Sequence, residues 1–550
     1  MDRFRWGPAQ CVLAVVLAVC ATGPVLDMGL NDDWSFAYIV RGLARTGHLS
    51  YDGWAAPLLG FQAWFGAALI SLFGFSFNLL RLSTLPFAAG CGWLVYGLAR
   101  RTGVSSSLAA FGSLSFTLSP VFIPLAASFM SDIPALFFWL ATFYCAGRSA
   151  EDGGRPRFWL IAAAVAGFSG GTIRQVVWVA PALVLPAVAW LRRENRRLVI
   201  FAAVLWCALL LAVAVCVHWY ARQSGHQPFP APQIAEAVTQ LLEPVRLMTL
   251  ACFLALLPVL CLYFAGRQRW RSAILGALAA GGFLAACVWW FKDDFLLGNM
   301  VTRYGVLWQD SEAMGDKPEI LGPAVLSILG TLLCLAVGVT LARLLDAWRG
   351  RRESAATSVP LRRFLLLTMP ACALYVTAVA YRYIGDGILF DRYLLFVTAP
   401  LIVALLWVYQ NRVGTAVSPP AGIVLAAFAV FGVCSTHDYI AAARARLQAA
   451  RIVMAAGIPR TRISAGLEFD GWTQLEQTGQ IPPLQVRRRD PRVFPIADPY
   501  WFWRMTPAID PRYVVVYSPI EGLRDSPFLP IGYHAWLPPF HRRVLTQTMP

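Results

Sequence analysis

The chain is short of charged residues. Only 14% of its 550 residues are Asp, Glu, Lys or Arg, whereas 58% are hydrophobic. Apolar runs of membrane-spanning length recur from residue 8 to residue 434. A soluble enzyme cannot bury that much apolar surface, so the composition excludes a soluble globular protein and predicts a polytopic membrane protein.

The signatures of several enzyme and binding classes are also missing. The sequence has no CxxC pair, no Walker loop and no GxGxxG after a strand, and its 6 histidines are scattered, so no zinc cluster is visible. The 12 cysteines all lie in the apolar part and are interpreted as small hydrophobic residues. The net charge of +16 does not predict a nucleic-acid partner, because the arginines cluster in short loops between apolar segments.

The apolar segments predict about thirteen transmembrane helices. Arginine-rich loops alternate with loops that carry the acids, so we expect the N-terminus in the cytoplasm and the C-terminus outside. The predicted spans are 8–26, 78–99, 106–124, 132–148, 157–171, 173–191, 198–218, 247–266, 272–291, 321–345, 364–381, 392–411 and 420–434.

One apolar segment, residues 57–75, is ambiguous. It is apolar enough to span, but a crossing there would turn every later arginine cluster outward. Its many aromatic residues suit the membrane interface. We therefore predict that residues 27–77 form an outer loop with two interfacial helices, and an ordinary membrane span remains the alternative for 57–75.

The composition divides the chain into two domains. Residues 1–434 form the predicted transmembrane domain, and the polar residues 435–550 predict a small extracytoplasmic α/β domain. In this tail the pattern predicts a helix over 439–456, buried strands over 462–469 and 513–518, and an edge strand over 541–548.

Two groups of acids stand at the predicted outer ends of apolar segments. Asp32 and Asp33 follow the first span, and Asp132 opens a later one. Helix capping alone would explain each group. Because the topology brings Asp32 and Asp132 to the same outer surface, we also expect that they share one cavity.

Basic and polar residues mark the same side of the membrane. Arg174 and Gln175 interrupt an apolar stretch after two glycines, and an arginine at a membrane boundary is costly unless a phosphate or carboxylate pairs with it. Arg382, Arg392 and Tyr393 flank another outer loop and suit an anionic headgroup. Snorkelling to lipid and ion pairs within the chain are the alternatives.

Together these motifs resemble the GT-C membrane glycosyltransferases. The resemblance is greatest to the bacterial branch that includes the aminoarabinose–lipid A transferase and the protein O-mannosyltransferases. It rests on Asp32-Asp33 followed by Gly47-His48, Met130-Ser131-Asp132-Ile133-Pro134, Gly171-Thr172-Ile173-Arg174-Gln175, Asp391-Arg392-Tyr393-Leu394-Leu395 and the tail motif Gly466-Leu467-Glu468-Phe469-Asp470-Gly471-Trp472.

The resemblance implies an inverting transferase in a bacterial inner (plasma) membrane. Its donor would be a polyprenyl-phosphate-linked sugar, and its acceptor a hydroxyl of a lipid, glycan or protein outside the cytoplasm. In that scheme Asp32 is the base, and Asp33 and Asp132 orient the acceptor and the base. The residues expected to bind the donor phosphate are Arg174, Gln175, Arg382, Arg392 and Tyr393.

The sequence also departs from that family's pattern. The acidic pair is Asp-Asp rather than the commoner Asp-Glu, and no lysine follows the short stretch that ends at Pro57. The acceptor and a requirement for a divalent metal ion therefore stay open, and no residue is assigned as a metal ligand.

Two other classes of function remain as alternatives. A transporter or flippase of a lipid-linked sugar would place ionisable groups near the bilayer midplane, often within internal repeats, whereas these acids gather at the outer ends of spans. A non-catalytic assembly or receptor protein would use the outer domain, but it leaves the carboxylates at the membrane edge without a role.

Overall fold

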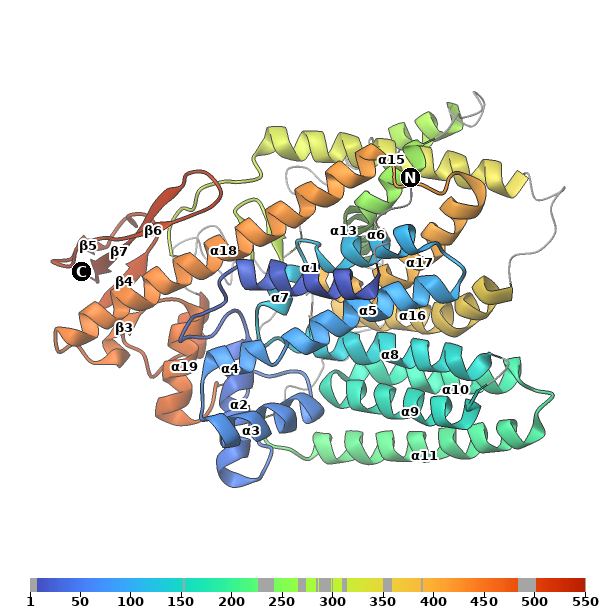
Figure 1. Ribbon diagram of the computed structural model, residues 1–550. Coiled ribbons are helices and arrows are strands. Elements are labelled where there is room, and N and C mark those ends of the chain that lie inside the picture. The colour runs from blue at the N-terminus through green and yellow to red at the C-terminus, as the bar shows by residue number, and fades with distance from the viewer. Residues whose placement is uncertain are drawn as a thin grey trace.

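The computed structural model describes residues 7–151, 154–225, 242–265, 274–282, 285, 298, 300–308, 314–349, 359–386, 389–482 and 501–549. Helices dominate this part of the chain (Figure 1). Within it, 6 helices are long and apolar enough to cross a membrane, and shorter apolar helices cover 8–21, 60–73, 175–191 and 248–264. The membrane fold is as predicted, but the count of about thirteen spans is not confirmed. Of the predicted span 272–291, the structure describes only residues 274–282 and 285.

The first half of the chain builds a helical bundle. Arg100 and Arg101 occupy the last turn of α5, where cations are favoured by the helix dipole. In Figure 1, α8, α9, α10 and α11 run side by side. The helices of this half are α1 (Pro8–Ala21), α5 (Leu85–Arg101), α6 (Ser106–Thr117), α7 (Phe122–Ala126), α8 (Asp132–Ala150), α9 (Pro156–Ile173), η1 (Gln175–Trp178), α10 (Val179–Leu191) and α11 (Arg196–Ala221).

The second half adds long helices and one small hairpin. Its elements are α13 (Leu242–Leu260), η2 (Cys261–Phe264), the strands β1 (Val301–Thr302) and β2 (Gly305–Val306), α15 (Pro323–Arg349), α16 (Val359–Asp386), η5 (Asp391–Leu394), α17 (Leu395–Arg412) and α18 (Pro419–Ala455). The 37-residue helix α18 runs without a break from the last predicted span into the polar tail, so the proposed domain boundary at 434/435 lies inside it. In Figure 1 this helix joins the bundle to the C-terminal sheet.

The predicted outer loop 27–77 contains two helices, α2 (Asp33–Thr46) and α3 (Gly60–Phe73), and α4 (Phe77–Leu82) begins at its end. At 1.5 Å per residue, the 14 residues of α3 extend only about 21 Å, which is less than the ~30 Å hydrocarbon core. Because α1, a predicted span, is also 14 residues long, length alone does not separate the two positions, and the interfacial position stays a prediction. In Figure 1, α2, α3 and α4 lie at the same end of the molecule as the C-terminal domain.

The C-terminal domain is a small sheet with one main helix. The strands β3 (Ile463–Ser464) and β4 (Tyr513–Val516) pair in parallel, and α19 (Leu467–Thr478) lies between them in sequence. The strand β7 (His541–Thr548) pairs with β4, β5 (Arg524–Asp525) and β6 (Ile531–His534), and all three pairings are antiparallel. The remaining short helices are η6 (Arg460–Arg462) and η7 (Trp501–Met505).

Two predictions about this domain are wrong. The segment 462–469 is not one long strand, because Gly466 has a positive φ of 99° that ends the extended backbone and α19 begins at Leu467. The segment 541–548 is a strand but not an edge, since other strands pair along both of its sides. The prediction for 513–518 is confirmed by β4.

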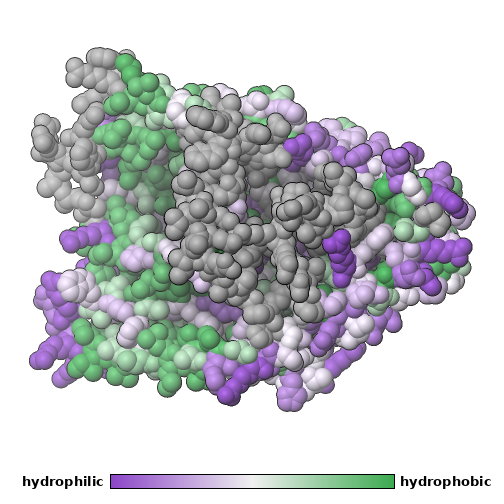
Figure 2. Space-filling view, turned by 180° about the vertical axis from the view of Figure 1, so that it is seen from behind, coloured by the Kyte–Doolittle hydropathy of each residue, from purple (hydrophilic) through white to green (hydrophobic). Residues whose placement is uncertain are grey.

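The surface follows the predicted division between membrane and water. Figure 2 shows hydrophobic side chains over the helical bundle, between a hydrophilic margin at one end and the hydrophilic C-terminal domain at the other. Single exposed apolar residues on α11, such as Ile200, Val204 and Leu211, are suited to a lipid-facing helix.

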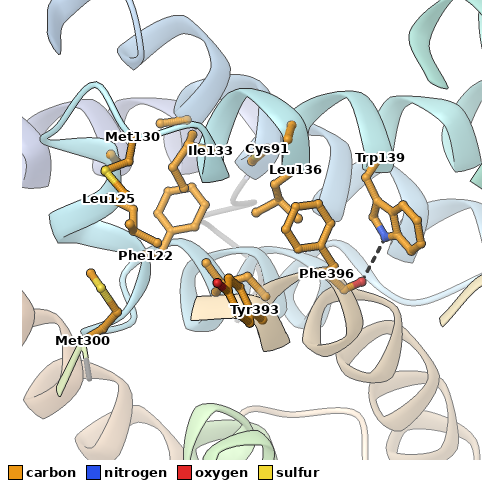
Figure 3. Packing of buried hydrophobic residues seen from close by; sticks show 14 of the residues in the cluster. Cys91, Phe122, Leu125, Met130, Ile133, Leu136, Trp139, Met300, Tyr393 and Phe396 are labelled. Carbon is orange, nitrogen blue, oxygen red and sulfur yellow. Dashed lines mark hydrogen bonds between the residues drawn. The ribbon is translucent and has the colours of Figure 1, made fainter. Parts of the chain in front are cut away.

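Buried aromatic residues join the two halves of the bundle. The indole Nε1 of Trp139 on α8 donates a hydrogen bond of 2.9 Å to the carbonyl oxygen of Phe396 on α17 (Figure 3). Tyr375 of α16 stacks on Phe396 and donates a hydrogen bond of 2.8 Å to the carbonyl oxygen of Tyr393. These contacts hold the start of α17 beside α8, at the end of α8 where Asp132 lies.

We expect Gly171→Ala to destabilise the protein. A Cβ at Gly171 would overlap the indole ring of Trp178, and a buried ring has little room to move. Overpacking of this kind costs about 1–3 kcal/mol. Gly147→Ala is the matched control, because a Cβ there meets open space. Thermal unfolding in detergent should give a lower midpoint for Gly171→Ala alone, and equal midpoints for the two variants would contradict the packing argument.

Candidate active site

Asp32 is the accessible carboxylate of the acidic pair. It stands at the N-cap of α2, but its side chain makes no capping hydrogen bond. Instead its Oδ1 accepts a hydrogen bond of 3.1 Å from the indole Nε1 of Trp54, and its Oδ2 lies 3.5 Å from Nη2 of Arg392. The side chain is 22% exposed. Plain helix capping therefore does not explain Asp32, whose carboxylate is turned toward a cation and remains reachable.

Asp132 begins α8 and is completely buried. Its Oδ1 forms an ion pair with Nη1 of Arg174 and lies 3.9 Å from Nε of Arg392. Arg174 lies where α9 ends and the chain turns in extended conformation toward η1. Thus the turn after α9 and the start of α8 meet through one charge pair.

Arg392 brings the two predicted acids together. It belongs to η5, it is only 4% exposed, and its guanidinium faces both Asp32 and Asp132. These two acids come from segments a hundred residues apart in the chain. A buried guanidinium is stable only when carboxylates or hydrogen bonds compensate its charge. The shared contact with Arg392 therefore puts the two acids in one site.

A cationic surface surrounds the ring of Tyr393. The guanidinium carbons of Arg174 and Arg382 lie 5.3 Å and 5.4 Å from the ring centroid, and that of Arg392 lies 5.9 Å away. Each distance is within the range of a cation–π contact. Arg382 comes from α16, so three separate segments of the chain each contribute one arginine. Guanidinium groups grouped in this way suit a phosphate, which they bind with paired hydrogen bonds.

Asp33 occupies a different environment from Asp32. It is 1% exposed, and its oxygens accept hydrogen bonds from the backbone N–H groups of Leu30, at 2.6 Å, and Phe129, at 3.1 Å. Nε of Arg81 lies 3.6 Å from its Oδ2. Burial raises the pKa of Asp33 to about 6, although Arg81 and the two hydrogen bonds act against that rise. Asp33 thus ties the loop before α2 to the loop before α8, and its carboxylate is enclosed by protein groups.

Gln175 lies next to Arg174, as the first residue of η1. Its side chain is hydrogen-bonded to the phenol of Tyr220. The hydroxyl of Tyr220 donates a hydrogen bond of 2.9 Å to the carbonyl oxygen of Ala56 in the first outer loop. Gln175 therefore contributes to the junction of α11, η1 and the loop, beside the arginine cluster.

Several residues of the site had no clear signal in the sequence. Arg81 donates to the carbonyl oxygens of Leu26 and Met28, in the loop that leads to Asp32, and it is 3% exposed. From the sequence, an isolated arginine at a helix end is interpreted as a surface charge. The burial of Arg81 in the structure shows that it is an internal residue instead. Trp54, which binds Asp32, stood among many aromatic residues of the same loop.

Asp391, which directly precedes Arg392 in the sequence, mainly accepts hydrogen bonds from backbone N–H groups. Its carboxylate accepts hydrogen bonds from the N–H groups of Met300, at 3.0 Å, and Val301, at 3.1 Å. It also accepts one of 2.9 Å from the N–H of Arg392. These bonds attach the β1–β2 hairpin to the start of η5. Among the described residues, no three His, Cys, Asp or Glu side chains are grouped as metal ligands.

A family model covers part of this site. Residues 57–220, which include Asp132, Arg174 and Gln175, match the family model described as dolichyl-phosphate-mannose-protein mannosyltransferase. The match covers about a third of the chain and agrees with the predicted resemblance to the GT-C glycosyltransferases. The predicted resemblance is therefore confirmed. A search of curated proteins found no match to this chain.

Several solved structures show a distant likeness to this chain. ArnT from Cupriavidus metallidurans in the apo state is 15% identical, with a TM-score of 0.39 and 98% of each chain covered. The Archaeoglobus fulgidus oligosaccharyltransferase in the apo form is 14% identical, with a TM-score of 0.42, and the alignment covers 93% of this chain and 70% of that one.

A third solved structure aligns over a shorter part. The S. cerevisiae protein O-mannosyltransferase Pmt1-Pmt2 complex bound to the sugar donor is 17% identical, with a TM-score of 0.31. The alignment covers 41% of this chain and spans 34% of the yeast chain.

The burial of Asp33 predicts a pH dependence of stability. Its pKa is about 6 in the folded protein and 3.8 as the ordinary value, so between these values the folded state binds more protons than the unfolded state. Stability contributed by this group is therefore present below pH 3.8, falls as the pH rises toward 6, and is constant above it. Asp33→Asn should remove that part of the slope.

The measurement is the unfolding free energy of both proteins across this pH range. Because other carboxylates titrate in both proteins, the quantity to compare is the difference between wild type and Asp33→Asn. The wild type should become less stable relative to Asp33→Asn as the pH rises to about 6. A difference that stays constant with pH would show that Asp33 does not titrate as its burial indicates.

Proposed function

We propose that the protein is an inverting glycosyltransferase. It moves a sugar from a polyprenyl-phosphate donor to an acceptor hydroxyl on the extracytoplasmic side of a bacterial plasma membrane. The observation that carries the proposal is the contact of Arg392 with both Asp32 and Asp132, beside the three arginines around Tyr393. A base and an anion-binding surface thereby lie next to each other.

Asp32 is the proposed general base. Its side chain is partly exposed, and Trp54 and Arg392 hold its two oxygens in place. A carboxylate in this position removes the proton of the acceptor hydroxyl as the new bond to the anomeric carbon forms. It also stabilises the positive charge that develops on the sugar in the transition state. The bond between the anomeric carbon and the phosphate oxygen breaks in the same step, so the configuration inverts.

Arg174, Arg382, Arg392 and Tyr393 form the proposed site for the donor phosphate. The phosphate leaves with the bonding electron pair, and fixed guanidinium groups stabilise its charge without help from an acid. A well-placed group of this kind lowers the activation barrier by about 3 kcal/mol. Asp132 holds Arg174 and Arg392 in place, and Asp33 and Gln175 fix the loops on either side.

The family description supports a lipid-phosphate donor, because it names dolichyl-phosphate-mannose as the sugar source of that family. We propose that the N-terminus is cytoplasmic and that the C-terminal domain is extracytoplasmic, as the arginine-rich loops predict. The acceptor is a lipid, glycan or protein hydroxyl. The acids lie at helix ends rather than within the spans, which does not favour a transporter.

The first test of this proposal is Asp32→Asn. The variant should fold as the wild type does and lose transfer by about 10³-fold or more, because the amide cannot accept a proton. Purified protein is given a panel of polyprenyl-phosphate sugars, and release of free polyprenyl phosphate is measured. Asp27→Asn is the matched control, since Asp27 lies in the same loop but pairs with Arg451 at the surface.

The outcomes of this test separate the functions. Release that depends on Asp32 and is unchanged in Asp27→Asn supports the transferase. Full activity of Asp32→Asn would remove Asp32 as the base. Uptake of a lipid-linked sugar into proteoliposomes without release of polyprenyl phosphate would instead support a transporter or flippase.

The second test concerns the donor phosphate. Arg382→Gln should raise the KM for the donor by roughly tenfold, because one charged hydrogen bond to the phosphate is lost. The KM for the acceptor should change little. Arg462→Gln is the control, since Arg462 is an exposed arginine of the C-terminal domain that pairs with Asp510. An equal effect of the two substitutions would show that the cluster does not bind the donor.

A further inference from the structure

The tail motif around Gly466–Trp472 has no part in the chemistry proposed above, yet it lies against the acidic pair. It forms the start of α19, which packs beside α2. Along this contact Trp472 meets Tyr38 edge-on, with ring centroids 6.0 Å apart. One turn further on, Arg41 pairs with Glu476 at 3.3 Å. The C-terminal domain thus contacts the helix that begins at Asp33.

The first connection from this segment to Asp32 runs through Glu468. Its Oε1 faces the backbone N–H of Asn31 at 3.4 Å, and it also accepts a hydrogen bond of 2.5 Å from the hydroxyl of Tyr439. Its Oε2 accepts two bonds from Arg446, at 3.2 Å and 3.3 Å. Burial raises the pKa of Glu468, but Arg446 and Tyr439 outweigh burial and hold the pKa below its ordinary value. Asn31 has a positive φ of 56°, so an anchored carboxylate faces the strained residue just before Asp32.

The second connection runs through Gly471 and two stacked indoles. A Cβ at Gly471 would lie 2.7 Å from the ring of Trp34, so only glycine leaves room for this completely buried side chain. Trp34 stacks on Trp54, with ring centroids 6.0 Å apart. Trp54 in turn donates its indole hydrogen bond to Asp32. A shift of α19 would therefore displace Asp32 through two rigid rings that are in contact.

The third connection runs through Ile481, just after α19. Its N–H donates a hydrogen bond of 2.7 Å to the carbonyl oxygen of Asp52. The carboxylate of Asp52 accepts hydrogen bonds from the N–H groups of Trp54, at 3.0 Å, and Ala55, at 3.2 Å. This turn fixes the backbone of the residue that binds Asp32. Three separate contacts from residues 468–481 thus reach the immediate neighbours of one carboxylate.

We propose that α19 of the C-terminal domain is a positioning element for the base. Glu468 and Gly471 are its positioning residues, and they set where the carboxylate of Asp32 stands relative to the arginine cluster. The inference rests on the proposed function, because it takes Asp32 as the base. Arg174 follows α9, whereas Arg382 and Arg392 lie in α16 and η5, and Asp132 holds Arg174 and Arg392 independently of α19. A shift of α19 therefore moves the base and leaves the phosphate site in place.

The test is Gly471→Ala in the full-length protein. The added methyl group pushes Trp34 and, through Trp54, displaces Asp32. A displacement of about 1 Å in a reacting group lowers the rate by up to ~10²-fold, so kcat should fall at least tenfold. The KM for the polyprenyl-phosphate sugar should stay within about twofold, because its arginines do not move. Gly42→Ala, on α2 itself and facing open space, is the matched control and should keep wild-type kcat.

A second pair of variants keeps the test decisive if Gly471→Ala folds poorly. Trp34→Phe removes the ring atoms that the new methyl group meets. Adding Gly471→Ala to Trp34→Phe should therefore lower kcat less than twofold further, whereas it lowers kcat tenfold when Trp34 is present. This coupling between the two sites is what a double-mutant cycle measures.

The outcomes are distinct from those of the function test. A fall in kcat with unchanged donor KM, relieved by Trp34→Phe, supports the proposal. A kcat equal to that of Gly42→Ala, or equal losses in kcat and donor affinity, would overturn it. Full activity of Asp32→Asn would instead overturn the choice of base, and it is measured independently of α19.

Discussion

The site depends on one buried cation. Arg392 is almost inaccessible, and a guanidinium removed from water is stable only beside compensating carboxylates. Asp32 from the outer loop and Asp132 from the start of α8 provide these charges. Asp132 is itself buried and needs a partner for its negative charge. Arg174 provides that partner. A chain of alternating charges thus assembles residues that hydrophobic packing alone would not bring together.

Much of this arrangement could be predicted from charge and hydropathy. In an apolar chain every acid or arginine at a membrane edge needs a partner, so sidedness predicted that Asp32 and Asp132 share one cavity and that Arg174 and Arg392 lie on the same side of the membrane. Burial could not be predicted in the same way. Asp32 and Asp33 are adjacent and identical in type, and only the loop conformation at Asn31 turns one toward Arg392 and the other toward Arg81.

The C-terminal domain shows where pattern reading fails. The residues 462–469 alternate as a strand does, but a glycine in a left-handed conformation ends the strand and Asp470 binds the backbone N–H of Ala465 in front of the new helix. The continuity of α18 was missed for another reason. Its first half exposes apolar side chains such as Ile423 and Val430, and its second half packs in the polar domain. Hydropathy therefore changes along the helix although the backbone does not.

That uninterrupted helix connects the helical bundle rigidly to the C-terminal domain. At 1.5 Å per residue, the 37 residues of α18 form a lever about 55 Å long. A span changes its tilt when the hydrocarbon thickness around it changes, and a tilt of about 5° moves the far end of such a lever by roughly 5 Å. A change in the tilt of this span would therefore displace the C-terminal sheet.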